Sequence, residues 1–100
     1  MAKGYLIANI EVTDPAAFDE YRSKVASVIA AHGGIYLLRG PELRSLEGAI
    51  GLKRLVVLEF PSLAAAEAFY RSDDYRPLLE LRKRSTRSDV VLAEGYTPPA

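Results

Sequence analysis

Apolar and polar residues alternate along residues 5–12. The even positions of this stretch are all apolar, whereas its odd positions are mixed: Leu6, Ala8, Ile10 and Val12 form the even set. Successive side chains of a strand point to opposite faces, so a period of two predicts a β-strand with one face on a core. We therefore expect a first strand here, with its even side covered by helices.

A helical period replaces this alternation over residues 14–32. Apolar residues recur mainly at steps of three and four and, together with the terminal histidine, form one stripe: Phe18, Tyr21, Val25, Val28, Ile29 and His32. Asp14 is a favourable N-cap, and Pro15 suits the first helical position, where its missing N–H has no partner in any case. Gly33 and Gly34 then favour the left-handed turn that ends helices. The segment is predicted to be an amphipathic helix.

The rest of the chain contains shorter periodic segments. The expected elements are a strand over 35–39 that continues over 42–47 after a bulge at Gly40-Pro41, a turn over 48–51, a strand over 53–60, a helix capped by Ser62, a helical segment over about 74–84 with Asp73 as its cap, and a strand over 89–96. This order, βαββαβ, predicts a ferredoxin-like α+β domain whose antiparallel sheet carries its helices on one face.

The helix-free face of such a sheet is strongly apolar in this sequence. It is expected to present Ile7, Leu55 and Val57, with contributions from Ile35, Leu37 and Leu92. Monomers seldom expose a continuous apolar patch of this size. We therefore expect a homodimer that pairs sheet to sheet about a two-fold axis.

Composition restricts the function further. The 100 residues, 49% hydrophobic and 26% charged, fit a single domain over 1–96 with a tail over 97–100. Thirteen basic and thirteen acidic residues cancel, which argues against general nucleic-acid or anionic-membrane binding. The absence of cysteine excludes disulfides and thiolate chemistry. No apolar run approaches the roughly 18 residues of a membrane span, and the N-terminal pattern is not secretory, so a cytoplasmic protein is expected.

Several segments resemble the family known as domain of unknown function 1330. They are the run from Tyr5 to Pro15, Glu20-Tyr21-Arg22, Gly33-Gly34, Leu38-Arg39-Gly40, Leu46-Glu47-Gly48, the run from Lys53 to Ser62, and Ser88-Asp89 through Glu94-Gly95. The resemblance covers about residues 3–96 and implies a dimeric α+β barrel built from ferredoxin-like domains. It implies no established reaction. Relatives in the wider superfamily include cofactor-independent monooxygenases, haem-degrading enzymes, lactone isomerases and small-molecule binders, a range too broad to predict a function from the fold.

Arg39 and Glu59 are the paired polar candidates. If the second and third strands are antiparallel neighbours, the two side chains are expected to meet on the helix-free face. The pair then either fixes the strand register or holds an arginine that binds an anion, because a guanidinium matches carboxylate geometry. Asn9 and Glu94 are expected to project into the same space as further substrate-binding groups. In the opposite phase of the second strand, Tyr36 replaces Arg39.

His32 is the single histidine of the chain. Partial burial, or a favourable charge near the C-terminus of the first helix, accounts for it; the alternative is a general base, because histidine titrates near neutral pH. The haem-degrading relatives combine a first-strand asparagine, which Asn9 would match, with a histidine on a later helix. Here His32 lies on the first helix and tryptophan is absent, so haem is not expected. One histidine without cysteine also argues against a zinc site, and we expect no cofactor and no metal.

Two hypotheses for the function follow. The first is a cofactor-independent enzyme that acts on a small anionic organic molecule by acid–base chemistry, with Arg39 orienting it and Glu59 or His32 moving protons. The second is a non-catalytic module that binds a small ligand or only dimerises. A pocket is expected on the helix-free face and not at the basic cluster, which is predicted to be solvated at the end of the last helix: Arg82, Lys83, Arg84 and Arg87.

Overall fold

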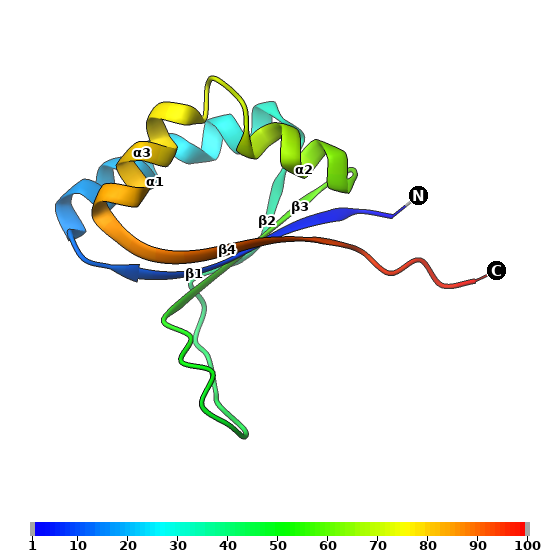
Figure 1. The fold of residues 1–100 in the computed structure, drawn as a ribbon, viewed down its shortest axis with the longest axis horizontal. Coiled ribbons are helices and arrows are strands. Elements are labelled where there is room, and N and C mark those ends of the chain that lie inside the picture. The colour runs from blue at the N-terminus through cyan, green and yellow to red at the C-terminus, as the bar shows by residue number, and fades with distance from the viewer. Residues whose placement is uncertain (1, 100) are drawn as a thin grey trace.

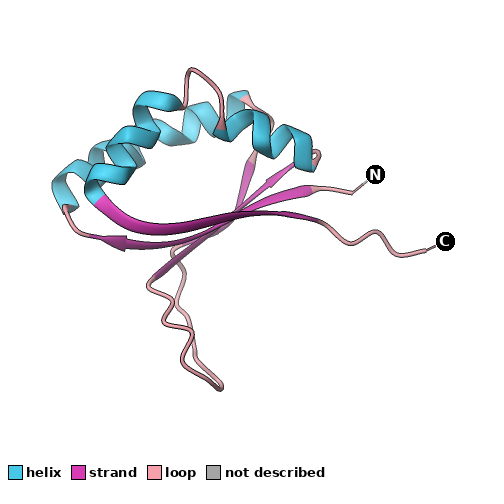
Figure 2. Ribbon diagram, viewed as in Figure 1, coloured by secondary structure: helices cyan, strands magenta, loops and turns pink. Residues whose placement is uncertain are grey.

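The computed structural model describes residues 2–99. Within them, three helices cover one face of a four-stranded antiparallel sheet (Figures 1 and 2). The elements are β1 (Gly4–Val12), α1 (Pro15–Ala31), β2 (Ile35–Arg39), β3 (Arg54–Phe60), α2 (Leu63–Tyr70), α3 (Arg76–Ser85) and β4 (Thr86–Glu94). The strands lie in the order β2-β3-β1-β4. The predicted α+β architecture, an antiparallel sheet with its helices on one side, is confirmed at this level.

The first strand and the first helix form where local sequence predicts them. Leu6, Ala8 and Ile10 are buried beneath the helices, with 3 to 5% of their surface exposed. At the start of α1, the Asp14 side chain accepts a hydrogen bond from the backbone N–H of Ala17. Gly33 follows the helix in the left-handed region, with φ at 78°. Period, cap and stop signal agree in this part of the chain, which is why its structure can be predicted.

Aromatic rings fill the space between α2 and the sheet. Phe60 and Phe69 are each only 1% exposed, and their ring centroids lie 5.2 Å apart. Tyr75 also packs against Phe69, at 4.5 Å between centroids. Ser62 caps α2 as predicted, by accepting a hydrogen bond from the backbone N–H of Ala65. The core therefore lies wholly between the helices and one face of the sheet.

The predicted continuation of the second strand over 42–47 is wrong. Residues 40–53 form a loop that projects beyond the sheet on its helix-free side (Figure 1). Gly40 leaves the strand with a left-handed φ of 62°, and Pro41 has no N–H to continue a ladder. The bulge expected at Gly40-Pro41 lies instead within β2, between Tyr36 and Leu38.

The last helix and strand are displaced from their predicted bounds. The side chain of Ser72, not that of Asp73, accepts the hydrogen bond from the backbone N–H of Tyr75 before α3. Strand β4 begins directly after α3 and covers Thr86–Glu94 instead of the predicted 89–96. The backbone N–H groups of Thr13 and Asp14 both donate to the Ser85 carbonyl oxygen, at 2.8 and 3.0 Å. This junction fixes the end of α3 against the end of β1, so that β4 pairs along the whole of β1.

The register of β4 also corrects one predicted surface residue. Leu92 lies opposite Leu6 and packs against the core. Its neighbour Val91 lies opposite Ile7 on the helix-free face and is 57% exposed. A shift of one residue exchanges the two faces of a strand. Leu92 therefore belongs to the core, and Val91 takes the place predicted for it.

Candidate ligand-binding cavity

A small cavity lies between the sheet and the helices, on the face opposite to the one predicted. Its volume is about 40 Å³. Apolar side chains of the core form much of its wall. The polar lining residues are Tyr21, Arg22, Tyr36, Arg39, Arg54, Tyr70, Tyr75 and Arg82, and none of the described lining residues is acidic. A drug-sized ligand needs roughly 300 Å³ or more, so the enclosed space suits a short molecule or one functional group.

The bulge in β2 brings Tyr36 and Arg39 to the cavity together. Tyr36 lies opposite Leu58 and Arg39 lies opposite Val56, both of which are core-facing positions of β3. Leu37 is the additional residue between them, so residues three apart share one face. The Arg39 guanidinium carbon lies 4.6 Å from the centroid of the Tyr36 ring. Both residues therefore lie on the helix-covered face, and neither occupies the helix-free face on which the two alternatives placed them.

The predicted pair of Arg39 with Glu59 is wrong for the same reason. Glu59 lies opposite Ile35 on the helix-free face, away from Arg39. There the hydroxyl of Tyr5 donates to Glu59 Oε2 at 3.1 Å. This hydrogen bond raises the pKa of Tyr5 above its ordinary value. Glu59 therefore has a local partner and does not line the cavity.

Arg54 is a cavity residue that sequence analysis did not select. It precedes Val56 and Leu58 on the core-facing side of β3 and is half-buried. Its guanidinium passes directly over Gly40, where any Cβ would collide with it. Burial and the charges of Arg22 and Arg39 lower the pKa of Arg54. The sequence indicated this position, because Arg54 shares the even-numbered, core-facing side of the third strand with Val56 and Leu58.

Arg54 Nε has no hydrogen-bond partner. Among the described residues 2–99, it is the buried side-chain nitrogen or oxygen atom that makes no hydrogen bond. The Phe18 ring lies 5.7 Å from the guanidinium carbon and supplies no acceptor atom. A buried polar group without a partner is costly in free energy, and native structures contain few of them. The nitrogen therefore marks a place where an acceptor is missing.

Arg82 also lines the cavity. It was predicted to belong to a solvated basic cluster, but only 5% of its surface is exposed, because it continues the buried helical stripe of Leu78. Its Nε donates to the hydroxyl of Tyr75 at 3.4 Å, and that hydroxyl lies 2.9 Å from the hydroxyl of Tyr21. Lys83 and Arg84, by contrast, are exposed as predicted.

Asn9 and Glu94 do not come together. Asn9 lies on the helix-free face, where its Oδ1 accepts a hydrogen bond of 2.8 Å from the backbone N–H of Lys53. Glu94 lies opposite Gly4 at the far end of β1 and is exposed. Neither lines the cavity. Their predicted roles in ligand binding have no shared location in the structure.

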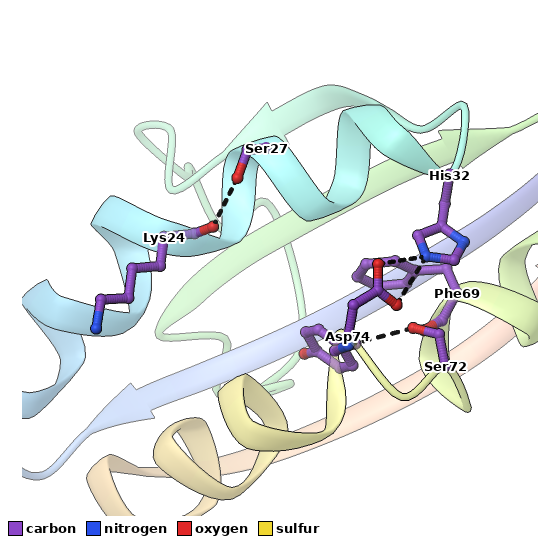
Figure 3. A network of polar contacts seen from close by, with 7 residues as sticks. Lys24, Ser27, His32, Phe69, Ser72 and Asp74 are labelled. Atoms are coloured by element: carbon purple, nitrogen blue, oxygen red, sulfur yellow. Dashed lines mark hydrogen bonds and ion pairs between the residues drawn. The ribbon is translucent and has the colours of Figure 1, made fainter.

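His32 contacts an acidic residue on the helical layer (Figure 3). Its Nε2 lies 3.1 Å from both carboxylate oxygens of Asp74, and its ring meets Phe69 edge to face at 5.7 Å between centroids. Hydrogen bonding from Ser72 and from His32 lowers the pKa of Asp74. His32 is not among the cavity residues, and its role as a general base stays a prediction.

Residues 2–99 contain no group of three or more His, Cys, Asp or Glu side chains placed to hold a metal ion. No helix in this range has both the length and the apolar character needed to cross a membrane.

The family model described as Domain of unknown function (DUF1330) matches residues 3–96. The chain belongs to this family. None of the curated proteins matches the DUF1330 chain.

Solved structures resemble the DUF1330 chain at low sequence identity. A protein of unknown function from Rhodopseudomonas palustris is 17% identical with a TM-score of 0.76, over 97% of this chain and 85% of that one. SnoaB, a cofactor-independent oxygenase from Streptomyces nogalater, is 14% identical with a TM-score of 0.65, over 98% and 97% of the two chains. A conserved protein from Methanosarcina mazei Go1 is 18% identical with a TM-score of 0.57, over 93% and 92%. Identities this low show a shared fold and nothing more.

Proposed function

We propose that this protein binds a small organic anion, whose carboxylate lies against Arg22, Arg39 and Arg54 at the mouth of the cavity. The observation that carries the proposal is the unpartnered Arg54 Nε in a cavity with no acidic lining residue among those described. Arginine binds carboxylates through two parallel hydrogen bonds. A ligand carboxylate would therefore supply the missing acceptor and offset the repulsion among three cations.

The surroundings strengthen such a contact. Arg22 and Arg39 are exposed and Arg54 is half-buried. The three charges therefore differ in their distance from solvent, and that of Arg54 is the most buried. A charge-assisted hydrogen bond gains strength as the local dielectric falls. The inner wall, formed by residues such as Val25 and Leu58, would receive the apolar part of the ligand. The proposal thus keeps Arg39 as a binding residue but gives it Arg54, not Glu59, as its neighbour.

The test is a titration with butanoate, followed by thermal unfolding and by the NMR signal of Arg54 Nε–H, with sodium chloride at equal ionic strength as the reference. Butanoate should raise the melting temperature and shift this signal. Arg54→Gln should abolish both effects. The matched control is Arg71→Gln, which removes an exposed arginine paired with Glu67 on α2 and should leave binding unchanged. Equal responses to butanoate and chloride would contradict the proposal.

An enzyme is the second candidate. SnoaB, which shares the fold, is named as a cofactor-independent oxygenase, and an apolar cavity with polar groups is compatible with catalysis. Glu59 and His32 lie outside the cavity, so proton transfer would need a different group. Turnover of a bound anion in the absence of any added cofactor would favour this candidate over simple binding.

We further propose that the DUF1330 chain is a ferredoxin-like domain that forms a dimeric barrel through its helix-free face. A continuous apolar row crosses all four strands of that face, in the order Leu38, Val57, Ile7 and Val91. Val91 is 57% and Leu38 is 38% exposed. Burial of such a row against a second copy would remove it from water.

Light scattering at micromolar concentration tests the dimer. The expected mass is twice the 11.0 kDa of one chain. Val91→Lys should shift the mass toward one chain, because it places two charges in a symmetric apolar interface. Ala26→Lys, on the exposed side of α1, is the charge-matched control and should remain dimeric. A folded wild-type monomer at this concentration would overturn the dimer without affecting the proposed anion site.

A further inference from the structure

A second polar cluster, formed by Tyr21, Tyr75 and Arg82, lies in the wall of the same cavity. Tyr21 comes from α1, whereas Tyr75 and Arg82 come from the start and the body of α3. Tyr75 is 3%, Arg82 5% and Tyr21 9% exposed. The cluster is therefore buried, in contrast to the exposed Arg22 and Arg39 at the mouth.

The cluster has more hydrogen-bond donors than acceptors. Arg82 Nε donates to the Tyr75 hydroxyl, and one hydroxyl proton is used between Tyr75 and Tyr21. The two tyrosines carry two hydroxyl protons, so one remains whichever of them donates. The described residues offer this proton no further acceptor. A guanidinium, for its part, can only donate.

No carboxylate balances the charge of Arg82. The salt bridges of the described residues do not include it: they join Lys24 to Glu20, His32 to Asp74, Arg44 to Glu42, Arg71 to Glu67 and Arg76 to Asp73. The hydroxyl of Tyr21 does not serve as a phenolate counterion either, because burial raises the pKa of Tyr21 above its ordinary value. An isolated buried charge is costly in free energy unless it is paired and hydrogen-bonded. The cluster thus has no carboxylate beside Arg82 and no acceptor for one tyrosine hydroxyl proton among the described residues.

We propose that the bound anion carries a second oxygen, a carbonyl or hydroxyl group on the chain remote from its carboxylate, which accepts hydrogen bonds from the Tyr21–Tyr75–Arg82 cluster. This inference rests on the proposed function, since it assigns the carboxylate to the arginines at the mouth. The volume of about 40 Å³ limits the enclosed part of the ligand to a few atoms. The class of ligand is therefore a short oxo or hydroxy acid.

The experiment compares matched acids that differ in the remote oxygen. Wild-type protein is titrated with pentanoate and 4-oxopentanoate, and with butanoate and 4-hydroxybutanoate, and dissociation constants are measured by NMR at equal ionic strength. One additional hydrogen bond predicts that at least one oxygenated acid binds about three- to tenfold more tightly than its partner. Wild-type protein that prefers neither oxygenated acid would overturn the inference.

Variants assign any preference to the cluster. Tyr75→Phe should abolish the preference for the oxygenated acid, measured as the ratio of the two dissociation constants in the same variant. Tyr70→Phe is the matched control, because Tyr70 lines the same cavity outside the cluster, and it should retain the preference. If Tyr75→Phe does not give a folded spectrum, Tyr21→Phe takes its place. A preference that survives removal of the hydroxyl would overturn the inference.

The two proposals fail in different ways. If Arg54→Gln abolishes binding of all four acids and Tyr75→Phe changes nothing, the anion site stands and the second contact is wrong. If none of the four acids binds to wild-type protein, the anion site itself is wrong and this inference is overturned with it.

Discussion

The two faces of the sheet treat their polar groups differently. On the helix-free face, Glu59 accepts a hydrogen bond from Tyr5, and Asn9 accepts one from the backbone of Lys53. On the helix-covered face, Arg54 Nε lacks a partner and Arg82 lacks a carboxylate. Polar residues on an apolar surface are therefore a weak indication of a site when the protein itself satisfies them. Unsatisfied donors beside a cavity are the stronger one.

The largest expected effect tests which face holds the core. Leu58 and Leu55 lie on the same strand and point to opposite faces, so their replacement by alanine removes the same atoms from each side. Leu58→Ala should lower the free energy of unfolding by about 2–5 kcal/mol because it leaves a buried cavity. Urea unfolding measures the difference.

Leu55→Ala should cost roughly half as much or less, because this side chain is only half-buried in one chain. If the helix-free face pairs with a second copy, this loss should depend on protein concentration, whereas the loss in Leu58→Ala should keep a large concentration-independent part. Equal losses in both variants at all concentrations would contradict the contrast between the faces.

A smaller loss of stability is expected at Gly40, which lies beside the Arg54 guanidinium. Gly40→Ala places a Cβ at a left-handed φ of 62° and against the Arg54 guanidinium. The backbone alone should cost about 1–2 kcal/mol. Displacement of Arg54 should in addition weaken butanoate binding. Gly48→Ala also introduces a left-handed alanine, at φ of 79°, but nothing lies within 4 Å of its Cβ. It should therefore show the backbone cost without the loss of binding.

The hydrogen-bonded pair of Tyr5 and Glu59 on the helix-free face should contribute still less to the free energy of unfolding. The folded pKa of Tyr5 is raised above its ordinary value of 10.0 by its hydrogen bond to Glu59. The neutral hydroxyl is thus favoured in the folded state, so the stabilisation is complete at lower pH and is lost as the pH rises through the raised value. Tyr5→Phe should reduce stability slightly at neutral pH and flatten the alkaline decline. Unfolding curves from about pH 7 to about pH 11 provide the measurement. An unchanged alkaline slope would contradict the contribution of this pair.

The smallest expected effect concerns the outer side of the helical layer. The folded pKa of Asp74 lies below its ordinary value of 3.8. Its contribution to stability is therefore present above that value and is lost as the pH falls through the lower folded value. Asp74→Asn should remove this part of the acid dependence in urea unfolding between about pH 5 and about pH 2. Asp73→Asn, at a neighbouring residue whose side chain is 94% exposed, should leave the dependence unchanged.

Local signals sufficed for much of the fold. The alternation of β1 and the stripe, cap and glycine stop of α1 act over a few residues, so their structure follows from sequence alone. The end of β2 was less predictable, because a single bulge shifts every following side chain to the other face. That shift separated Arg39 from Glu59 and brought it beside Tyr36.

The sequence by itself determined the α+β class and the position of most helices and strands, because caps, stops and hydrophobic period are set by neighbouring residues. Only the tertiary structure decided which charged groups share the cavity. Arg22, Arg54 and Arg82 come from α1, β3 and α3 and meet through strand register and helix packing. Such contacts depend on residues far apart in the chain, and one added residue within a strand can redirect them. Hence the architecture was predictable, whereas the site was not.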